Sequence, residues 1–282
     1  MQDPVLTMIL QSYVPGRPLG DFVELFWSCS ESPSLLRGQI LPKGTIEVII
    51  NLGEREIRIQ DHRNPDRCQR HAGAVVCGAY SSAFVTEHAE RASVIGVHFR
   101  PGGASPFLNV PAGELAETHV DLETLWGRAA IDLRERLCEA MTSAECFSLL
   151  EQALTARLTD ATDRHRAIPI ALAAFEQSDA SVQIRDVARQ VGLSQRRFIQ
   201  VFATDVGLTP KLYSRVRRFQ RALRLVNGVS APDWARVALD GGYCDQSHLI
   251  RDFRAFAGLT PEEYLRRRNG PVPHDHVLPV TP

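Results

Sequence analysis

Two short segments of the chain carry side chains that can contact the edges of nucleobases. An arginine can donate two parallel hydrogen bonds to guanine, a glutamine can pair similarly with adenine, and an aliphatic side chain can contact the methyl group of thymine. On helices, the outer faces of the two segments would present these residues: Gln195, Arg196, Ile199 and Gln200 in the first, and Gln246, Ser247, Ile250 and Arg251 in the second. Arg197 beside the first set, and Arg215, Arg217 and Arg218 between the sets, suit phosphate contacts or a solvated face.

Other groups that could do chemistry give weaker patterns. Cys68, His71 and Cys77 lie near one another, but their spacing fits no standard zinc motif, and we expect a loop with unrelated thiols. His98 lacks the second histidine and the glutamate of a metal-binding barrel, so we expect a core histidine. We expect Trp27 to pack in a core rather than to stack on a ligand. Nucleophile elbows and phosphate-binding loops do not occur, and we therefore expect no enzyme, no cofactor and no metal.

The composition is that of a globular chain with reduced thiols. The 282 residues predict two domains, and 44% hydrophobic with 23% charged residues allows a real core. None of the six cysteines forms a C-x-x-C pair, which favours a reducing compartment. The sequence has no apolar run of the ~18–20 residues that a membrane span needs, and the N-terminus lacks a secretory pattern. We expect a cytoplasmic protein without a membrane partner.

The net charge of −1 conceals an asymmetry between the two halves. Residues 1–164 contain 15 basic and 22 acidic residues, a net charge of −7, whereas residues 165–268 contain 17 basic and 10 acidic residues, a net charge of +7. A basic region joined to an acidic one points to an anionic partner for the C-terminal region alone.

The first half of the chain is predicted to be rich in β-strands. Residues 22–27, 45–50 and 93–99 are short runs of β-branched and aromatic residues, separated by glycine, proline and asparagine. Such strands are typical of a small sandwich or barrel. From about Leu122 the apolar residues recur every three or four positions, which predicts two helices with these inner residues: Leu125, Ala129, Leu133 and Leu137, then Phe147, Leu150, Leu154 and Leu158. These helices would either cover the barrel or form a dimer seam.

We divide the chain into four parts. Residues 1–126 form a β-rich sensor domain, cupin-like or a sandwich, and residues 127–164 form a helical connector that could dimerise. The polar stretch 159–164 is the expected linker, residues 165–268 form an all-helical domain, and residues 269–282 form a flexible tail. The expected fold class is therefore α+β.

The helical domain contains an internal duplication. Gly207–Tyr213 (GLTPKLY) recurs as Gly258–Tyr264 (GLTPEEY) at an offset of 51, and further apolar positions match in the same register. Each copy predicts a helix, a short turn containing glycine and a second helix, which is the pattern of a helix-turn-helix. In the first copy we expect the caps Ser181 and Ser194.

The second copy and the segment between the copies complete the domain. In the second copy we expect Pro232 in the first turn of the first helix and Asp245 as the cap of the second. A long helix over about residues 211–227 would join the copies. A plain helical hairpin domain would explain neither the duplication nor the charge.

These residues resemble the AraC/XylS family of transcription regulators. The resemblance rests on Gly242–Phe253 (GYCDQSHLIRDF), Gly258–Pro261 and Tyr264, and it covers about residues 168–268. It implies seven helices and two recognition helices about one DNA turn apart. It also implies that seven residues read bases: Arg196, Ile199, Gln200, Gln246, Ser247, Ile250 and Arg251.

The N-terminal half resembles, more loosely, a poorly characterised domain that precedes such DNA-binding units. The matching pieces are Phe26-Trp27, Leu41–Gly44 and Gly96–Ala104. The resemblance implies ligand sensing, dimerisation or both. We expect a sequence-specific regulator whose partner is double-stranded DNA, with a small-molecule effector, RNA polymerase and a second copy of the chain as candidate partners. The alternatives are a DNA-repair enzyme or another enzyme with a DNA-targeting domain, and a nucleoid-type protein without sequence preference.

Overall fold

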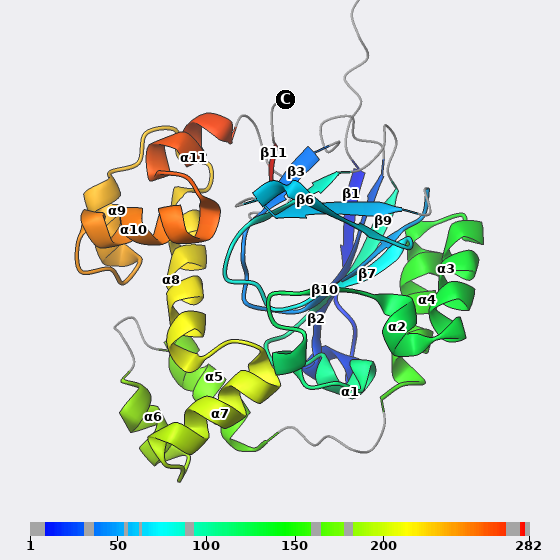
Figure 1. Cartoon of the computed structure of the whole chain (residues 1–282), viewed down its shortest axis with the longest axis horizontal. Helices are drawn as coiled ribbons and strands as arrows, with labels where there is room; N and C mark the ends of the chain where they lie inside the picture. Colours follow the sequence, from blue (N-terminus) through cyan, green and yellow to red (C-terminus); the bar gives the residue numbers. More distant parts are fainter. Residues whose placement is uncertain are drawn as a thin grey trace, which may run out of the picture.

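The computed structural model describes residues 9–30, 37–53, 56–61, 64–87, 93–158, 165–177, 183–268 and 277–279. A β-rich region lies between two groups of helices (Figure 1), with α2–α4 against one side and α5–α11 against the other. The expected linker at 159–164 and the expected cap Ser181 lie outside the described residues. The predicted fold class is confirmed: a β-rich domain precedes an all-helical region.

The β-rich region consists of two antiparallel sheets. The first has the strand order β1-β2-β9-β4-β7-β10 and the second the order β11-β3-β8-β5-β6. The strands are β1 Ile9–Tyr13, β2 Val23–Ser30, β3 Arg37–Ile40, β4 Glu47–Asn51, β5 Ile57–Asp61, β6 Asn64–His71, β7 Ala74–Cys77, β8 Phe84–Glu87, β9 Val94–Phe99, β10 His119–Asp121 and β11 Val277–Pro279. The three predicted strands correspond to β2, β4 and β9.

The central strands β4, β7 and β9 are buried on both faces. Alternate residues of a strand point to opposite faces, so each strand contributes to two cores. Ile49 and Val75 belong to a cluster that includes residues of the second sheet, whereas Val48 and Val97 belong to a cluster with the helices that follow. This arrangement explains why these strands consist mostly of apolar residues.

Helices α2–α4 cover the outer face of the first sheet. They span Leu122–Trp126, Arg128–Glu139 and Ser143–Thr155, and a short helix α1 at Ser105–Leu108 precedes them. The leucines at 133, 137, 150 and 154 are at most 4% exposed and belong to the core of the sheet. These four leucines therefore cover the sheet, as the first of the two expected arrangements requires. The first predicted helix is interrupted at Gly127, so Ala130 and not Ala129 is buried.

The C-terminal region contains the seven expected helices. They are α5 Ala167–Gln177, α6 Ile184–Gln190, α7 Gln195–Val206, α8 Pro210–Val226, α9 Trp234–Asp240, α10 Gln246–Ala257 and α11 Pro261–Arg267. The starts of α7 and α10 differ by 51 residues and those of α6 and α9 by 50, so the duplication in the sequence is a duplication of structure. Gly192 and Gly242 both lie at positive φ in the two turns.

Two details of these helices differ from the prediction. Gln183 is the N-cap of α6, and α9 begins at Trp234 with Asp233 as its cap, so Pro232 precedes the helix. The Asp233 carboxylate accepts hydrogen bonds from the backbone N–H groups of residues 235 and 236. The Pro232 side chain has no acceptor for such bonds, so the helix begins after Asp233.

The residues after Arg268 also differ from the expected tail. Val277–Pro279 form β11, which pairs antiparallel with β3 at the edge of the second sheet. This pairing supplies backbone hydrogen bonds to an edge that would otherwise be open. The prediction of a flexible tail did not include this strand, because three residues that end in a proline carry no strand pattern.

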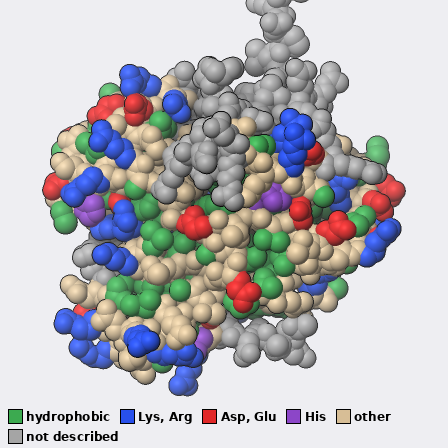
Figure 2. All heavy atoms as spheres, in the orientation of Figure 1, with side chains coloured by type: hydrophobic (Ala, Val, Ile, Leu, Met, Phe, Trp, Pro, Cys, Tyr) green, Lys and Arg blue, Asp and Glu red, His purple; other side chains and the backbone are tan. Residues whose placement is uncertain are grey.

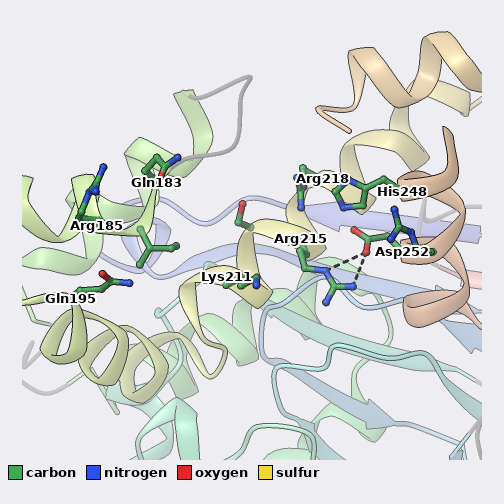
Figure 3. Close-up of a pocket in the computed structure, with 11 residues that line it drawn as sticks. Gln183, Arg185, Gln195, Lys211, Arg215, Arg218, His248 and Asp252 are labelled. Carbon is green, nitrogen blue, oxygen red and sulfur yellow. Dashed lines mark hydrogen bonds and ion pairs between the residues drawn. The ribbon is translucent and has the colours of Figure 1, made fainter. Parts of the chain in front are cut away.

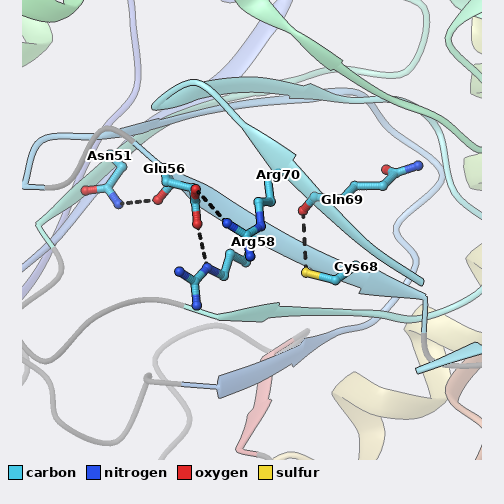
Figure 4. Close-up of polar contacts among 6 residues, drawn as sticks. All are labelled: Asn51, Glu56, Arg58, Cys68, Gln69 and Arg70. Carbon is cyan, nitrogen blue, oxygen red and sulfur yellow. Dashed lines mark hydrogen bonds and ion pairs between the residues drawn. The ribbon is translucent and has the colours of Figure 1, made fainter. Parts of the chain in front are cut away.

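The cysteine and histidine group that we expected in a loop lies instead on strands. Cys68 is exposed on β6, where its thiol donates to the Gln69 carbonyl, beside the ion pairs of Glu56 with Arg58 and Arg70 (Figure 4). His71 ends the same strand and is buried, as is Cys77 on β7. Among the described residues, no three potential metal ligands gather.

The β-rich region packs directly against the C-terminal helices. Leu41, Ala79 and Ala83 are buried in the same core as α7, α8 and α10. The buried Gln220 of α8 donates a hydrogen bond of 2.7 Å to the Pro42 carbonyl. Gly207, at φ +90°, ends α7, and a Cβ there would lie 2.8 Å from the Ala79 Cβ atom. The two regions thus form one packed unit.

Candidate nucleic-acid interface

Helix α7 presents the first predicted set of base-reading residues on its outer face. The Ser194 side chain caps the helix by accepting a hydrogen bond from the Arg197 N–H group, and Phe198 and Phe202 are buried beneath it. Gln195, Arg196, Arg197 and Gln200 are exposed, and Ile199 is half-buried. The guanidinium group of Arg197 donates a hydrogen bond of 3.0 Å to the Gln200 side chain, so these two predicted residues form a linked pair.

Helix α10 repeats this arrangement one copy later. The Asp245 carboxylate caps it at the His248 N–H group, and Leu249 and Phe253 fix its inner face. The predicted residues Gln246, Ser247 and Arg251 are exposed, and Ile250 is half-buried. The Arg251 side chain donates to the Ser247 carbonyl at 3.3 Å, which holds it along its own helix. Both predicted sets therefore occupy equivalent solvent-facing positions.

A groove separates the two helix-turn-helix units (Figure 3). We call it the interhelical groove, and its volume is about 710 Å³. Its lining residues come from α6 with its cap, α7, α8 and α10. They are Gln183, Ile184, Arg185, Gln195, Lys211, Ser214, Arg215, Arg218, His248, Arg251 and Asp252. The first unit borders it on one side, α8 crosses its floor and α10 borders the other side. Five of these side chains are lysine or arginine and one is acidic, so the groove suits an anion.

The acidic residue in the groove is neutralised inside the protein. Asp252 is buried, and its Oδ1 atom accepts hydrogen bonds from Arg215 Nε at 3.2 Å and from Arg215 Nη2 at 2.7 Å. This ion pair joins the linker helix α8 to α10. Arg215 therefore holds α10 in position against α8. Two of its guanidinium nitrogens bind one Asp252 oxygen, and the rest of the guanidinium lines the groove.

Arg218 likewise has a role in the fold that the sequence did not indicate. Its Nη1 atom donates to the Gly242 carbonyl in the turn of the second unit, and its guanidinium lies 5.4 Å from the centroid of the buried Tyr243 ring. Burial, followed by the charge of Asp252, raises the pKa of Tyr243 well above its ordinary value. Arg218 thus stabilises the second turn while it lines the groove. Arg217, beside it on α8, is half-buried and does not line the groove.

Sequence reasoning missed Arg185, Lys211 and His248 as parts of the same surface. Helical periodicity relates residues within one helix, whereas these three lie on α6, α8 and α10. In Figure 2, basic side chains gather over the region of the C-terminal helices, which agrees with the net charge of +7 for residues 165–268.

The β-rich region holds a second group of polar residues, around His98. Glu47 is buried between strands and accepts a hydrogen bond of 2.7 Å from the Trp27 indole, while His98 lies 3.7 Å from Glu47 and 3.4 Å from Glu24. Burial by itself would raise the pKa of Glu47, but His98, Lys43 and Trp27 outweigh it and lower the pKa to about 2. His98 is a core histidine, as predicted, although two carboxylates accompany it.

Trp27 is half-buried and belongs to the core between the two sheets. Its indole lies so close to Gly96 that any side chain at position 96 would collide with it. Core packing, the favoured interpretation of Trp27, is confirmed.

No described helix is long and apolar enough to cross a membrane.

Two family models match the chain. A domain of unknown function, DUF6597, matches residues 11–121, and a helix-turn-helix domain matches residues 187–267. The first match covers all strands of the β-rich region except β1's first two residues and β11, and the second begins within α6 and ends with α11. The two matches agree with the looser resemblance of the N-terminal half and the specific resemblance of the C-terminal half.

The chain is also similar to a curated protein and to solved structures. An uncharacterized helix-turn-helix transcriptional regulator of Haemophilus influenzae is 26% identical over 119 residues, which are 42% of this chain and 38% of that protein, so the match spans about two fifths of the relative's length. ToxT of Vibrio cholerae has a TM-score of 0.48 at 11% identity, over 87% of this chain and 99% of ToxT. An AraC-type DNA-binding domain protein of Chromobacterium violaceum has a TM-score of 0.33 at 24% identity, over 38% and 95% of the two chains. The duplicated helix-turn-helix region belongs to the AraC-type family, and it follows a domain of a second family whose function is unknown.

Proposed function

We propose that this chain regulates transcription by reading two successive major-groove segments of DNA with α7 and α10. The observation that carries the proposal is the equivalence of the two helices: each begins at a side-chain cap, buries aromatic residues below and exposes arginine and glutamine above. The residues that would contact bases are Gln195, Arg196, Ile199, Gln200, Gln246, Ser247, Ile250 and Arg251. Each pair of arginine with guanine would add ~1–3 kcal/mol of discrimination.

The interhelical groove would accept the DNA backbone between the two major-groove segments. Arg185, Lys211 and the exposed part of Arg215 supply positive charge there, and Arg197 and Arg217 would contact phosphates beside it. Contacts of this kind fix the position of a protein on DNA without reading its sequence. They predict strong non-specific attraction and a steep dependence on salt.

The β-rich domain would control this reader through a small organic effector. Its direct packing on α7, α8 and α10 gives an effector a route to the DNA-binding helices. A second copy of the chain and RNA polymerase remain proposed partners. For the second copy, the buried leucines of α3 and α4 give no support, so a dimer would have to use exposed residues such as Met141.

The experiment that tests the proposal is a selection of the full chain against a pool of random duplexes, followed by titrations at several salt concentrations. We expect an enriched sequence with two conserved blocks and an affinity that falls steeply with salt. Lys211→Gln should make the salt slope shallower by about one unit, and Lys43→Gln, in the β-rich region, should leave it unchanged. Tight binding of every duplex with equal affinity would instead support a nucleoid-type protein, and salt-insensitive binding or none would contradict the proposal.

A further inference from the structure

A pocket of about 830 Å³ lies within the β-rich region. Ile59 of β5, Phe84 of β8 and His119 of β10 contribute to its lining, together with Tyr80 in the loop before β8 and Glu114. We call it the Tyr80 pocket. Its volume is within the range of ~300–1,000 Å³ that small-molecule sites occupy.

Three rings form an aromatic wall in this pocket. The Tyr80 ring centroid lies 5.0 Å from that of Phe84 and 4.6 Å from that of His119, and Phe84 and His119 are 4.6 Å apart. The Tyr80 hydroxyl lies 2.5 Å from His119 Nδ1. Burial, followed by the nearby His71, lowers the pKa of His119 to about 3, so its ring is neutral at pH 7. The wall therefore offers apolar faces with a polar edge.

The charges at the pocket are all negative. None of the described residues that line it is lysine or arginine, whereas Glu114 and Glu117 both line it. Glu117 accepts hydrogen bonds from the backbone N–H and the hydroxyl of Ser81, and it thereby fixes the loop that carries Tyr80. Glu114 is exposed. A carboxylate beside aromatic faces attracts a cation and repels an anion.

The same loop is connected to the second recognition helix. The N–H group of Ala83, which lines the pocket, donates a hydrogen bond of 2.8 Å to the Phe256 carbonyl, and the Gln39 side chain donates one of 2.8 Å to the Ala257 carbonyl. Phe256 and Ala257 are the last two residues of α10, and the final carbonyls of a helix have no partner within the helix. The β-rich domain therefore caps the C-terminal end of α10.

We propose that the Tyr80 pocket binds a small organic cation with an aromatic or compact apolar body, and that Ala83 transmits its occupancy to the end of α10. Any effect of the cation on DNA binding rests on the proposed function of α10. Binding of the cation, and its effect on the end of α10, are independent of that function. A ligand that contacts Tyr80 and Glu114 must press on the short loop between Tyr80 and Phe84. Because the Ala83 N–H group belongs to this loop, its bond to α10 is the first contact that changes.

Binding is tested by calorimetry of the full chain with three probes of similar size: benzyltrimethylammonium, neutral benzyl alcohol and anionic phenylacetate. We expect one benzyltrimethylammonium per chain, a weaker signal for benzyl alcohol and none for phenylacetate. Glu114→Gln and Phe84→Leu should each raise the Kd of the cation about tenfold. Glu123→Gln, an exposed substitution on α2 outside the pocket, is the matched control and should leave the Kd unchanged.

Equal binding of phenylacetate, no binding of the cation, or a Kd that neither Glu114→Gln nor Phe84→Leu changes would overturn the ligand assignment. Hydrogen exchange then tests the transmission, with no DNA present. Saturating benzyltrimethylammonium should change exchange severalfold at the last turn of α10, and the last turn of α4, which lies outside the pocket, provides the internal comparison. Unchanged exchange at residues 254–258 with the probe bound would overturn the transmission, while failure to bind DNA would concern only the proposed function.

Discussion

Arg215 and Asp252 join the helix between the two units to the second unit. Arg215 lies on α8 and donates to the buried carboxylate of Asp252 on α10 at 2.7 Å. The pair also lines the interhelical groove, so it supports the fold and places a positive charge beside the proposed DNA path. Removal of Arg215 leaves the Asp252 charge buried without its partner.

Arg215→Leu should therefore lower the free energy of unfolding by about 2–4 kcal/mol, because an unpaired buried charge is strongly destabilising. Arg217→Leu, two residues away on the same helix, should change it by less than about 0.5 kcal/mol. Urea unfolding of both variants measures the difference. A loss of similar size in the two variants would show that Arg215 has no special place in the fold.

The fragment of residues 164–268 should fold and bind DNA without the β-rich domain. It contains both helix-turn-helix units and the net charge of +7 for residues 165–268. Its unfolding free energy should nevertheless be lower than that of the same helices in the full chain, since Leu41, Ala79 and Ala83 no longer cover its core. Circular dichroism and salt-dependent DNA titrations check both points, and a folded fragment without salt-sensitive DNA binding would contradict the first.

The local pattern of the chain was sufficient to predict the C-terminal helices. Ser194 and Asp245 cap α7 and α10, as predicted, and Phe198 and Phe253 lie on the buried faces of these helices. Caps and apolar spacing are both readable from the sequence, because each depends only on residues within a few positions. The double role of Arg218 was not predictable, because its contact with Gly242 depends on how α8 crosses the second unit. The pairing of β11 with β3 was not predictable either, because the two strands are far apart in the sequence.

Sequence reasoning also did not place the residues of the Tyr80 pocket together, for a physical reason. Tyr80, Phe84 and His119 form one aromatic wall, but they come from a loop and two strands in different sheets. No periodicity relates residues across two facing sheets. The interhelical groove was not predictable for the same reason. Arg185 and Arg251 both line it, but only because α8 sets the spacing of the two units.

The unfolding free energy should fall as the pH decreases from 6.5. His119 has an ordinary pKa of 6.5, and in the folded chain it takes up a proton only near pH 3, so the unfolded chain binds more protons between these values. The slope can reach about 1.4 kcal/mol per pH unit for one such group. His119→Phe should flatten the dependence between pH 6.5 and 5, measured by urea unfolding.

Glu47→Gln provides the matched comparison for this pH dependence. The ordinary pKa of Glu47 is 4.5 and the folded chain lowers it to about 2, so this carboxylate contributes stability above pH 4.5 that is lost toward pH 2. Its replacement should change the slope only below about pH 4.5. A His119→Phe variant with an unaltered slope at pH 5–6.5 would contradict the neutral state of His119 in the folded chain.

Pairing of chains through the N-terminal half should be visible with residues 1–160. Met141 is 87% exposed at the turn between α3 and α4, where a second copy could cover it. Sedimentation at micromolar concentration should show a dimer that Met141→Glu weakens, whereas Glu139→Gln nearby should not. Monomers throughout the concentration range would remove the dimer from the account.

The placement of α7 and α10 as recognition helices makes the most direct prediction. Arg196→Ala and Arg251→Ala should each relax the base preference at one position, at a loss of ~1–3 kcal/mol, and the two positions should lie ~10 base pairs apart. Arg217→Ala should instead weaken binding evenly across sequences. Selection of duplexes by the parent chain and the three variants, followed by sequencing, measures all of this at once. Two relaxed positions one helical turn apart would agree with the account, and relaxation at the same base, or at none, would contradict it.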